Sequence, residues 1–336
     1  MRNHNKLSRK ERNILRKKII KRRRRLLASF IFIFVFGIFF IGYNLISNKD
    51  NNKILGNKPS KESTTVTSKP ETSTTEPEDE TSTTAPPVDN KDTGYLKLED
   101  DPNAEDAMMV FHNTEGLLKG TKTYPVRTDG KKVVYLTFDD GPSTTNTPKV
   151  LDILDQYNVK ATFFVLGKSI DTDSQSEELL KQIANNGHAI GNHSYSHDYN
   201  YLYPGRIISP ENFMSDINKC NDALKRVLGE DFKTRVVRFP GGYWSWDGRT
   251  NIRPILDEQG YAIIDWNTLN EDAQGSKKDA NQLLECTKKN TEALGPNADS
   301  IVLLMHDTYG KEATVDALPQ IIEYYKSLGF EFKTIK

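Results

Sequence analysis

The chain has 336 residues, with 46 basic and 46 acidic residues and a formal net charge of zero at pH 7. The charge is unevenly placed: residues 1–25 carry 13 Lys and Arg against one acid, Glu11, so the remaining chain has 33 basic and 45 acidic residues, a net charge of −12. Two cysteines, Cys220 and Cys286, exclude a disulfide scaffold, and the lack of a Cys-x-x-Cys pair excludes a cysteine zinc site.

A charge-free apolar run follows the basic terminus. Residues 26–46 read LLASFIFIFVFGIFFIGYNLI, close to the roughly 20 residues that cross a bilayer as a helix. The basic cluster just before it predicts a cytoplasmic tail (1–25), a transmembrane anchor (26–46) and an extracellular remainder at the cell membrane. We therefore interpret the cluster as a topology signal for a lipid-bilayer partner and expect no nucleic-acid partner. The alternative is a cleaved signal peptide, which would have a shorter apolar region and a small-residue cleavage site.

The next two segments lead to the main domain. Residues 47–92 are rich in Ser, Thr, Pro and Glu and poor in apolar residues, which predicts a disordered linker that tethers the domain to the membrane. Residues 93–130 form a lead-in segment, with a short helix expected over 104–118 and a strand over 122–127.

From residue 131 to residue 336, strand-like and helix-like segments alternate. Strands are expected at 133–138, 161–166, 188–192, 235–239, 262–266, 301–305 and 330–335, and helices at 148–157, 177–185, 210–228, 252–259, 278–294 and 315–328. The alternation predicts an α/β fold, a deformed (β/α) barrel of about seven parallel strands. An open doubly wound sheet is the alternative, and no glycine-rich nucleotide-binding loop follows any strand.

Acids and histidines stand at the ends of the expected strands. The first strand ends at Asp139 and Asp140, and His193 and His197 follow the third. The four-residue spacing predicts that both imidazoles lie on one side of a helical turn and, with Asp140, form a two-histidine, one-carboxylate metal site with open positions for water and substrate. The alternative for the two acids is a surface turn.

Three later strands end in polar groups as well. Arg238 and Gly241 follow the fourth strand, where an arginine can pair with a carboxylate and a glycine lets a backbone N–H approach a ligand. Asp265 lies at the end of the fifth strand, and His306 ends an apolar run on the sixth. His306 is interpreted as either a buried core histidine or a general acid tuned by a carboxylate such as Asp265.

These residues occur in an order that resembles a known family. The segments are Thr137-Phe138-Asp139-Asp140-Gly141-Pro142, His193-Ser194-x-x-His197, Arg238-x-Pro240, Asp265-Trp266 and Leu304-x-His306. Together they resemble the five motifs of the polysaccharide deacetylase family, the NodB homology domain of carbohydrate esterase family four. The resemblance covers residues 131–335 and implies a deformed (β/α) barrel that removes N-acetyl groups from sugars with a divalent metal, usually zinc.

The resemblance also implies roles for single residues. Asp139 would be the general base and Arg238 would steady it, while Asp140, His193 and His197 would bind the metal. A second set would act on the substrate: His306 would protonate the leaving amine with Asp265 as its tether, and Trp266 and Leu304 would line the pocket for the acetyl methyl. Gly241 stands where the family commonly has an aromatic residue, and Ala262 where it often has a further acid.

The anchor and the tether favour a cell-wall glycan as the substrate. The expected function is therefore deacetylation of N-acetylglucosamine or N-acetylmuramic acid residues in peptidoglycan. The alternatives are deacetylation of chitin-like or poly-N-acetylglucosamine polymers and ester cleavage on acetylated xylan. A catalytically inactive glycan-binding module would be expected to lack one of the metal or base residues, and this chain retains Asp139, Asp140 and both histidines.

Overall fold

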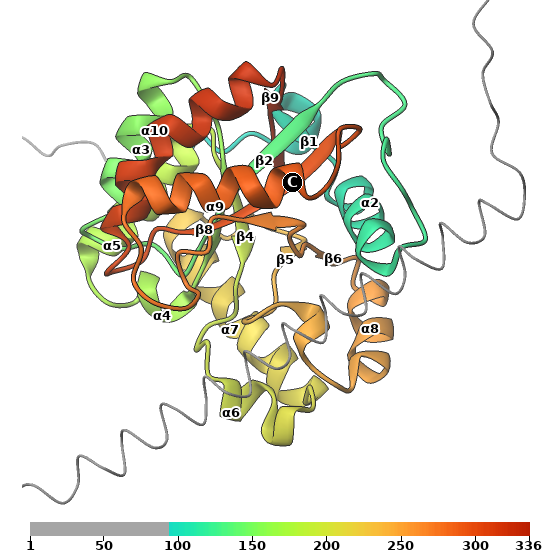
Figure 1. Cartoon of the computed structure of the whole chain (residues 1–336). Helices are drawn as coiled ribbons and strands as arrows, with labels where there is room; N and C mark the ends of the chain where they lie inside the picture. The colour runs from blue at the N-terminus through green and yellow to red at the C-terminus, as the bar shows by residue number, and fades with distance from the viewer. Residues whose placement is uncertain (1–93) are drawn as a thin grey trace, which may run out of the picture. The chain divides into compact units, whose positions relative to one another are not determined.

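The structure is a computed structural model and describes residues 94–336 (Figure 1). The predicted cytoplasmic tail, membrane anchor and linker lie outside the described residues. None of the helices between residues 94 and 336 has the length and apolar character that a membrane span needs.

A parallel sheet forms the centre of the described part. Its strands are β2 (Val133–Asp139), β3 (Thr162–Val165), β4 (Ala189–Asn192), β5 (Val236–Val237), β6 (Ala262–Ile263), β7 (Thr268–Leu269), β8 (Ser300–His306) and β9 (Glu331–Phe332). They are ordered β6-β5-β4-β3-β2-β8-β7, with β9 beside β2, and every pairing is parallel. No pairing joins β6 to β7 among these residues, so the curled sheet is a partial barrel, as the alternation predicted.

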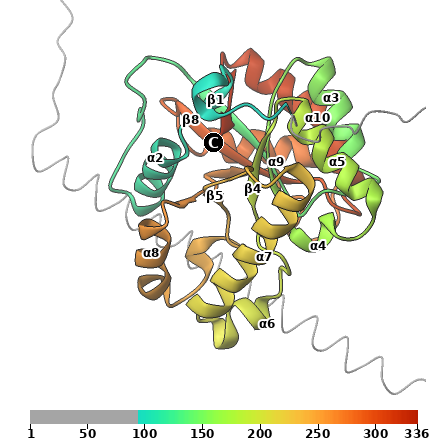
Figure 2. The same cartoon turned by 180° about the vertical axis from the view of Figure 1, so that it is seen from behind.

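Helices connect and cover the strands (Figures 1 and 2). They are α2 (Ala107–Lys119), α3 (Thr147–Gln156), α4 (Gly167–Ile170), α5 (Ser174–Asn185), α6 (Tyr199–Leu202), α7 (Pro210–Leu228), α8 (Arg249–Glu258), α9 (Ala280–Glu292) and α10 (Glu312–Ser327). Short 3-10 turns lie at η1 (Leu98–Asp100), η2 (Pro204–Arg206) and η3 (Tyr243–Ser245). The six helices expected beyond residue 131 are all present, with shifts of up to three residues at their ends.

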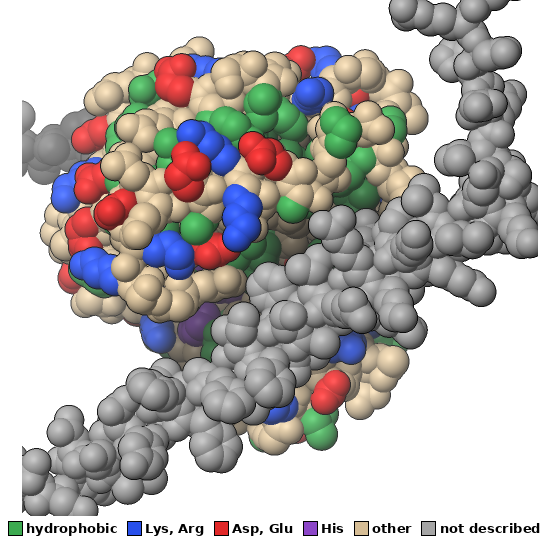
Figure 3. Space-filling view, in the orientation of Figure 1, with side chains coloured by type: hydrophobic (Ala, Val, Ile, Leu, Met, Phe, Trp, Pro, Cys, Tyr) green, Lys and Arg blue, Asp and Glu red, His purple; other side chains and the backbone are tan. Residues whose placement is uncertain are grey.

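Local sequence signals explain where several helices begin. The Asp279 side chain accepts a hydrogen bond from the backbone N–H of Gln282, and the Gln282 side chain accepts one from the backbone N–H of Asp279, a capping box that starts α9. Asp173 caps α5 and Ser209 caps α7, each with a side-chain oxygen that accepts one hydrogen bond from the backbone of the first turn. The outer faces of α9 and α10 carry interspersed acidic and basic side chains (Figure 3), as expected for helices that cover a sheet and face water.

Strand β2 packs in two hydrophobic cores because both of its faces are buried. All seven of its residues are buried. Val134, Leu136 and Phe138 pack in one hydrophobic core with α3, α5, α7 and α10, while Val133 and Tyr135 pack in a second core with α2 and α8. A strand buried on both faces reads as a continuous apolar run, and this one delivers Asp139 to the edge of the sheet.

The lead-in segment is part of this structure. Helix α2 contributes Val110 and Phe111 to the second core, and β1 (Ala104–Glu105) pairs with β10 (Thr334–Ile335) near the C-terminus. The expected strand over 122–127 is absent, and the expected strand over 330–335 is divided into β9 and β10. Strand β7 was not predicted.

Candidate active site

The carboxyl ends of the central strands bring the predicted residues together. Asp139 ends β2 and pairs in register with His306, which ends β8. Two strands away, Asn192 ends β4 directly before His193 and pairs with β5, which leads to Arg238. Parallel strands place their carboxyl ends at one edge of the sheet, so residues far apart in sequence share a site there.

Three of these side chains have the geometry of a cation site. Asp140 Oδ1 lies 3.5 Å from Nε2 of His193 and 3.4 Å from Nε2 of His197. All three ligand atoms fall within 4.8 Å of one another. Asp140 Oδ1 is buried and has no hydrogen-bond partner in the described structure, which fits an oxygen reserved for a ligand. This donor set is one that divalent transition metals bind.

The surroundings of His193 prepare it to bind a metal. Its Nδ1 lies 2.8 Å from the carbonyl oxygen of Arg238, which can only accept a hydrogen bond, so Nδ1 carries the proton and Nε2 keeps its lone pair. Burial lowers the pKa of His193 to about 3, which keeps the imidazole neutral.

The histidine pair lies on a loop, and the predicted helical turn is wrong. Ser194 and His197 have positive φ values of 74° and 52°, which a helix does not allow. Asp216 on α7 holds the loop: its Oδ2 accepts from the backbone N–H groups of Tyr195 and Ser196, each at 2.9 Å. These bonds replace those that a helix would have supplied. Asp216 was missed by the sequence analysis, since nothing in its helical pattern separates it from a solvent-facing acid.

Because Asp216 fixes the loop that carries both histidines, we expect Asp216→Ala to weaken the binding of a divalent metal ion about 10- to 100-fold, the usual range for a residue that orients metal ligands. Competition with a chromophoric chelator measures the affinity. Asp222→Ala, which removes an exposed acid from the same helix, is the matched control. Equal metal affinity in the two variants would contradict the role of Asp216.

Asp139 is held by a buried arginine. Nη1 of Arg238 lies 2.6 Å from Asp139 Oδ1 and 2.8 Å from the hydroxyl oxygen of Thr137, and its Nε donates to the carbonyl oxygen of Ile264. The Arg238 side chain is fully buried, and the ring of Phe164 lies 3.9 Å from its guanidinium carbon. Burial raises the pKa of Asp139 above its usual value, although the charges of Arg238 and His306 oppose the shift. This is the direction expected of a proton acceptor.

The structure corrects the partner of His306. Its Nδ1 lies 2.8 Å from Asp272 Oδ1, while Asp272 Oδ2 accepts from the backbone N–H of His306 at 2.9 Å and from the hydroxyl of Thr314 at 2.8 Å. Burial opposes a charged imidazole, but the hydrogen bond and charge of Asp272, together with the charges of Asp139 and Asp140, outweigh it and raise the pKa of His306 to about 9. His306 is therefore protonated at neutral pH.

Asp265 has a different contact. It accepts a hydrogen bond from the backbone N–H of Tyr243 at 3.1 Å, at the start of the turn η3, and burial raises its pKa to about 6. The prediction that Asp265 tethers His306 is thus wrong. Asp272 follows the two-residue strand β7, and the only sequence signal for it was a polar group, Asn270-Glu271-Asp272, after Thr268-Leu269.

The three predicted substrate-binding residues lie near these groups. Gly241 is exposed, has a φ of +75°, and its N–H has no acceptor among residues 94–336. Trp266 is half-buried, and its ring lies 5.7 Å from the guanidinium carbon of Arg238. Leu304 is buried on β8, two residues before His306 and on the same face of the strand. Their contact with a substrate stays a prediction.

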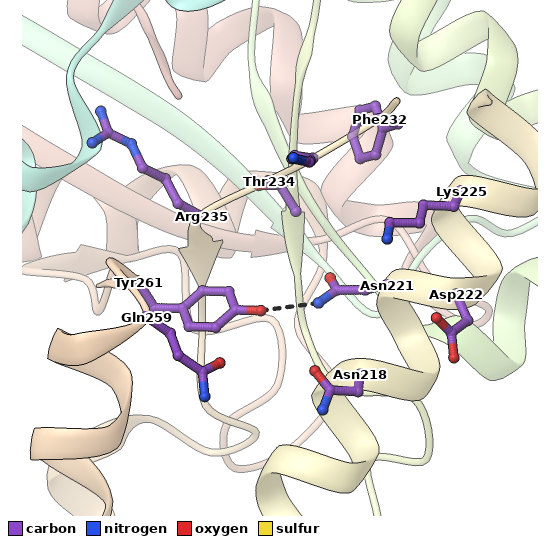
Figure 4. A pocket seen from close by; sticks show the side chains of 10 residues that line it. Asn218, Asn221, Asp222, Lys225, Phe232, Thr234, Arg235, Gln259 and Tyr261 are labelled. Carbon is purple, nitrogen blue, oxygen red and sulfur yellow. Dashed lines mark hydrogen bonds between the residues drawn. The ribbon is translucent and has the colours of Figure 1, made fainter. Parts of the chain in front are cut away.

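A separate cavity of about 370 Å³ lies between α7 and the segments that lead into β5 and β6 (Figure 4). Its lining includes Asn218, Asn221, Lys225, Arg235 and Tyr261, and Asn221 Nδ2 donates to the Tyr261 hydroxyl at 3.0 Å. These segments are at the amino ends of the strands. The cavity is therefore remote from the residues at the carboxyl ends and is not part of this site.

Known proteins are similar to this chain over the part that contains the site. A sequence profile of the family described as polysaccharide deacetylase matches residues 126–263. A peptidoglycan-N-acetylglucosamine deacetylase of Bacillus cereus is 35% identical over 208 residues, which cover 61% of this chain and 67% of that protein. A chitin deacetylase of Colletotrichum lindemuthianum is 34% identical over 208 residues, 60% of this chain and 77% of that protein.

A solved structure resembles the fold. The CE4 esterase of Streptococcus mutans has a TM-score of 0.62 and 35% sequence identity, and the match covers 70% of this chain and 92% of that one. The likeness extends over nearly all of that structure.

Proposed function

Because this chain belongs to the polysaccharide deacetylase family, we propose that it is a metal-dependent hydrolase that removes N-acetyl groups from N-acetylglucosamine or N-acetylmuramic acid residues of cell-wall peptidoglycan. The observation that carries the proposal is the cluster of Asp140, His193 and His197, with the buried carboxylate of Asp139 3.6 Å from His193 and Nε2 of His306 4.0 Å from Asp140. A group that accepts protons and a group that donates them, both beside one cation site, are what amide hydrolysis needs.

Asp140, His193 and His197 would hold the cation, for which we propose zinc. Such an ion supplies Lewis acidity, which polarises a carbonyl group and lowers the pKa of a water molecule. Asp139 and Arg238 stand next to this set: Asp139 Oδ2 lies 3.6 Å from Nε2 of His193. That distance leaves the carboxylate within reach of a water molecule at the site.

The protein groups then divide the proton transfers. Asp139 accepts a proton from water as the water oxygen attacks the acetamide carbon. The carbonyl oxygen gains negative charge, and the N–H of Gly241 donates to it. His306 donates the proton on its Nε2 to the sugar nitrogen, the carbon–nitrogen bond breaks, and acetate and a free amine leave. Asp272 holds the proton on Nδ1, so His306 presents Nε2 to the substrate.

Several glycans fit this chemistry. The likeness to a peptidoglycan deacetylase supports a wall glycan, and the extracellular tether predicted over 47–92 supports it independently. The likeness to a chitin deacetylase and to an esterase favours, as second candidates, chitin-like or poly-N-acetylglucosamine polymers and O-acetyl esters such as acetylated xylan. All of them would use the same catalytic groups.

We also propose that the chain is anchored in the cell membrane by residues 26–46, with its N-terminus in the cytoplasm and residues 94–336 outside. The support is the 21-residue charge-free apolar run and the basic cluster directly before it. A protease added to intact cells would remove the domain if this proposal is correct. A domain protected until the cells are lysed would contradict it.

The proposed activity is tested by free-amine release from N-acetylglucosamine oligomers and from purified peptidoglycan, with the full-length chain extracted in a mild detergent. We expect chelation to lower the rate at least about tenfold and added zinc to restore it, since the site depends on a cation. Acetate release from O-acetyl esters without any amine release would favour the esterase. No product from any of these substrates, with folded and zinc-loaded protein, would contradict the proposed function.

A further inference from the structure

The space beside the Gly241 backbone is filled by two aromatic side chains from other segments. A Cβ atom at Gly241 would lie 3.1 Å from the hydroxyl oxygen of Tyr199 and 3.1 Å from a ring atom of Trp246. Position 241 thus has no room for a side chain of its own without movement of these rings. Tyr199 begins α6, two residues after the predicted metal ligand His197, and so brings a large side chain to the place where Gly241 has none.

Tyr199 is the outermost ring of a packed aromatic row. The rings of Tyr203 and Trp246 stack at 4.1 Å between centroids, and the ring of Tyr199 meets Trp246 edge to face at 5.0 Å. Trp246 is fixed in turn, because its Nε1 donates to the carbonyl oxygen of Pro240 at 2.9 Å. Tyr203 is 2% exposed and Trp246 7%, whereas Tyr199 is 43% exposed. The row therefore holds an accessible ring in a defined position.

That position is next to the proposed reaction site. The ring of Tyr199 lies 5.1 Å from the ring of His197, and no hydrogen bond occupies its hydroxyl within residues 94–336. An isolated exposed aromatic residue needs no functional explanation. Tyr199 differs because its ring packs against buried rings, and because it lies beside both a predicted metal ligand and Gly241, whose N–H also has no acceptor among the described residues.

We propose that Tyr199 is a substrate-binding residue that forms the wall for the sugar ring that carries the acetamide group, in the place that a side chain at position 241 would otherwise take. An aromatic face offers a sugar a large, rigid apolar surface at low entropic cost, and the hydroxyl can donate to a sugar oxygen. The proposal rests on the proposed function, since it requires an N-acetylated glycan at this site.

Nearby Tyr201 provides a matched control. It lies on the same short helix and is similarly exposed, at 41%, but within residues 94–336 no ring contact joins it to the aromatic row. Residues two positions apart on a helix point in different directions. Removing Tyr201 therefore tests for a general effect of losing a tyrosine from α6.

The experiment compares Tyr199→Ala, Tyr199→Phe and Tyr201→Ala in the full-length chain, with KM and kcat for amine release from N-acetylglucosamine oligomers, equilibrium binding of the same oligomers, and zinc content. We expect Tyr199→Ala to raise KM and the dissociation constant about tenfold with zinc content unchanged, because the wall is lost and the metal ligands are not. Tyr199→Phe keeps the ring and should raise both less than about threefold. Tyr201→Ala should match the unmodified chain.

Three results would overturn the inference. The first is a Tyr199→Ala dissociation constant equal to that of Tyr201→Ala. The second is loss of zinc from Tyr199→Ala, which would show that the ring only supports His197. The third is an unmodified chain that binds no oligomer, which would contradict the proposed function too. An unmodified chain that binds oligomers without releasing amine would contradict only the proposed activity, and the binding constants would still decide the role of Tyr199.

Discussion

Asp139→Asn is expected to lower kcat for amine release about 10³-fold, while zinc binding remains. A general base contributes about 10²- to 10⁴-fold to a rate, and an amide cannot take the proton from water that the Asp139 carboxylate accepts. The substitution is nearly isosteric, and the amide oxygen can still accept the hydrogen bond that Arg238 donates to Asp139 Oδ1 at 2.6 Å. The measurement is the rate of amine release from the preferred glycan, beside zinc content.

The neighbouring acid is the matched control. Asp140→Asn alters one of the three ligand atoms, so it should lose both zinc and activity, whereas Asp139→Asn should lose activity alone. In Asp139→Asn, Arg238 keeps its buried charge but has lost the carboxylate that neutralised it, so we expect a lower unfolding temperature. The assay is therefore done well below that temperature. More than a tenth of the activity in Asp139→Asn, or equal zinc loss in both variants, would contradict the separation of roles.

The strands and the acids at their ends could be predicted because a buried parallel strand has a recognisable apolar sequence. Val133 to Asp139 is buried on both faces, and such a strand reads as a continuous apolar run that stops where the chain meets the site. His306 ends β8 in the same manner. Because parallel strands end at one edge, placing these residues on strands was enough to predict that they share a site.

The conformation of the histidine loop could not be predicted in this way. A four-residue spacing fits a helical turn, but Asp216 supplies hydrogen bonds from α7 that hold the loop in another conformation. Such a contact joins residues about 20 positions apart and produces no periodic pattern of apolar and polar residues in the sequence. The role of Tyr199 depends on a similar long-range contact, because the space beside Gly241 is visible only when Tyr199 and Trp246 are packed around it.

The error about Asp265 has a simpler origin. Strand β7 has only two residues, Thr268 and Leu269, too short for an alternation of apolar and polar residues to be recognised. The first acid after an apolar run, Asp265, was therefore paired with His306. In the structure, strand β7 lies between Asp265 and Asp272, and Asp272 is the carboxylate that contacts His306.

Asp272→Asn is the second substitution with a large expected effect, a loss of about 10²-fold or more in kcat. Asp272 Oδ1 holds the Nδ1 proton of His306, and an asparagine can present its NH₂ there instead, which favours the wrong tautomer. The pH profile should change as well. His306 must be protonated to act as an acid, so the activity of the unmodified chain should fall as pH rises through about 9, the pKa of His306.

In Asp272→Asn the burial that lowers the pKa of His306 remains, while the carboxylate that raises this pKa most is gone. The pKa of His306 therefore falls, and the alkaline limb of the profile of kcat/KM against pH should move to lower pH. Asp265→Asn is the matched control, because Asp265 contacts the backbone of Tyr243 and has no hydrogen bond to His306 in the described structure. It should keep the alkaline limb in place. A limb that moves in Asp265→Asn and stays in Asp272→Asn would show that Asp265, and not Asp272, sets the protonation of His306.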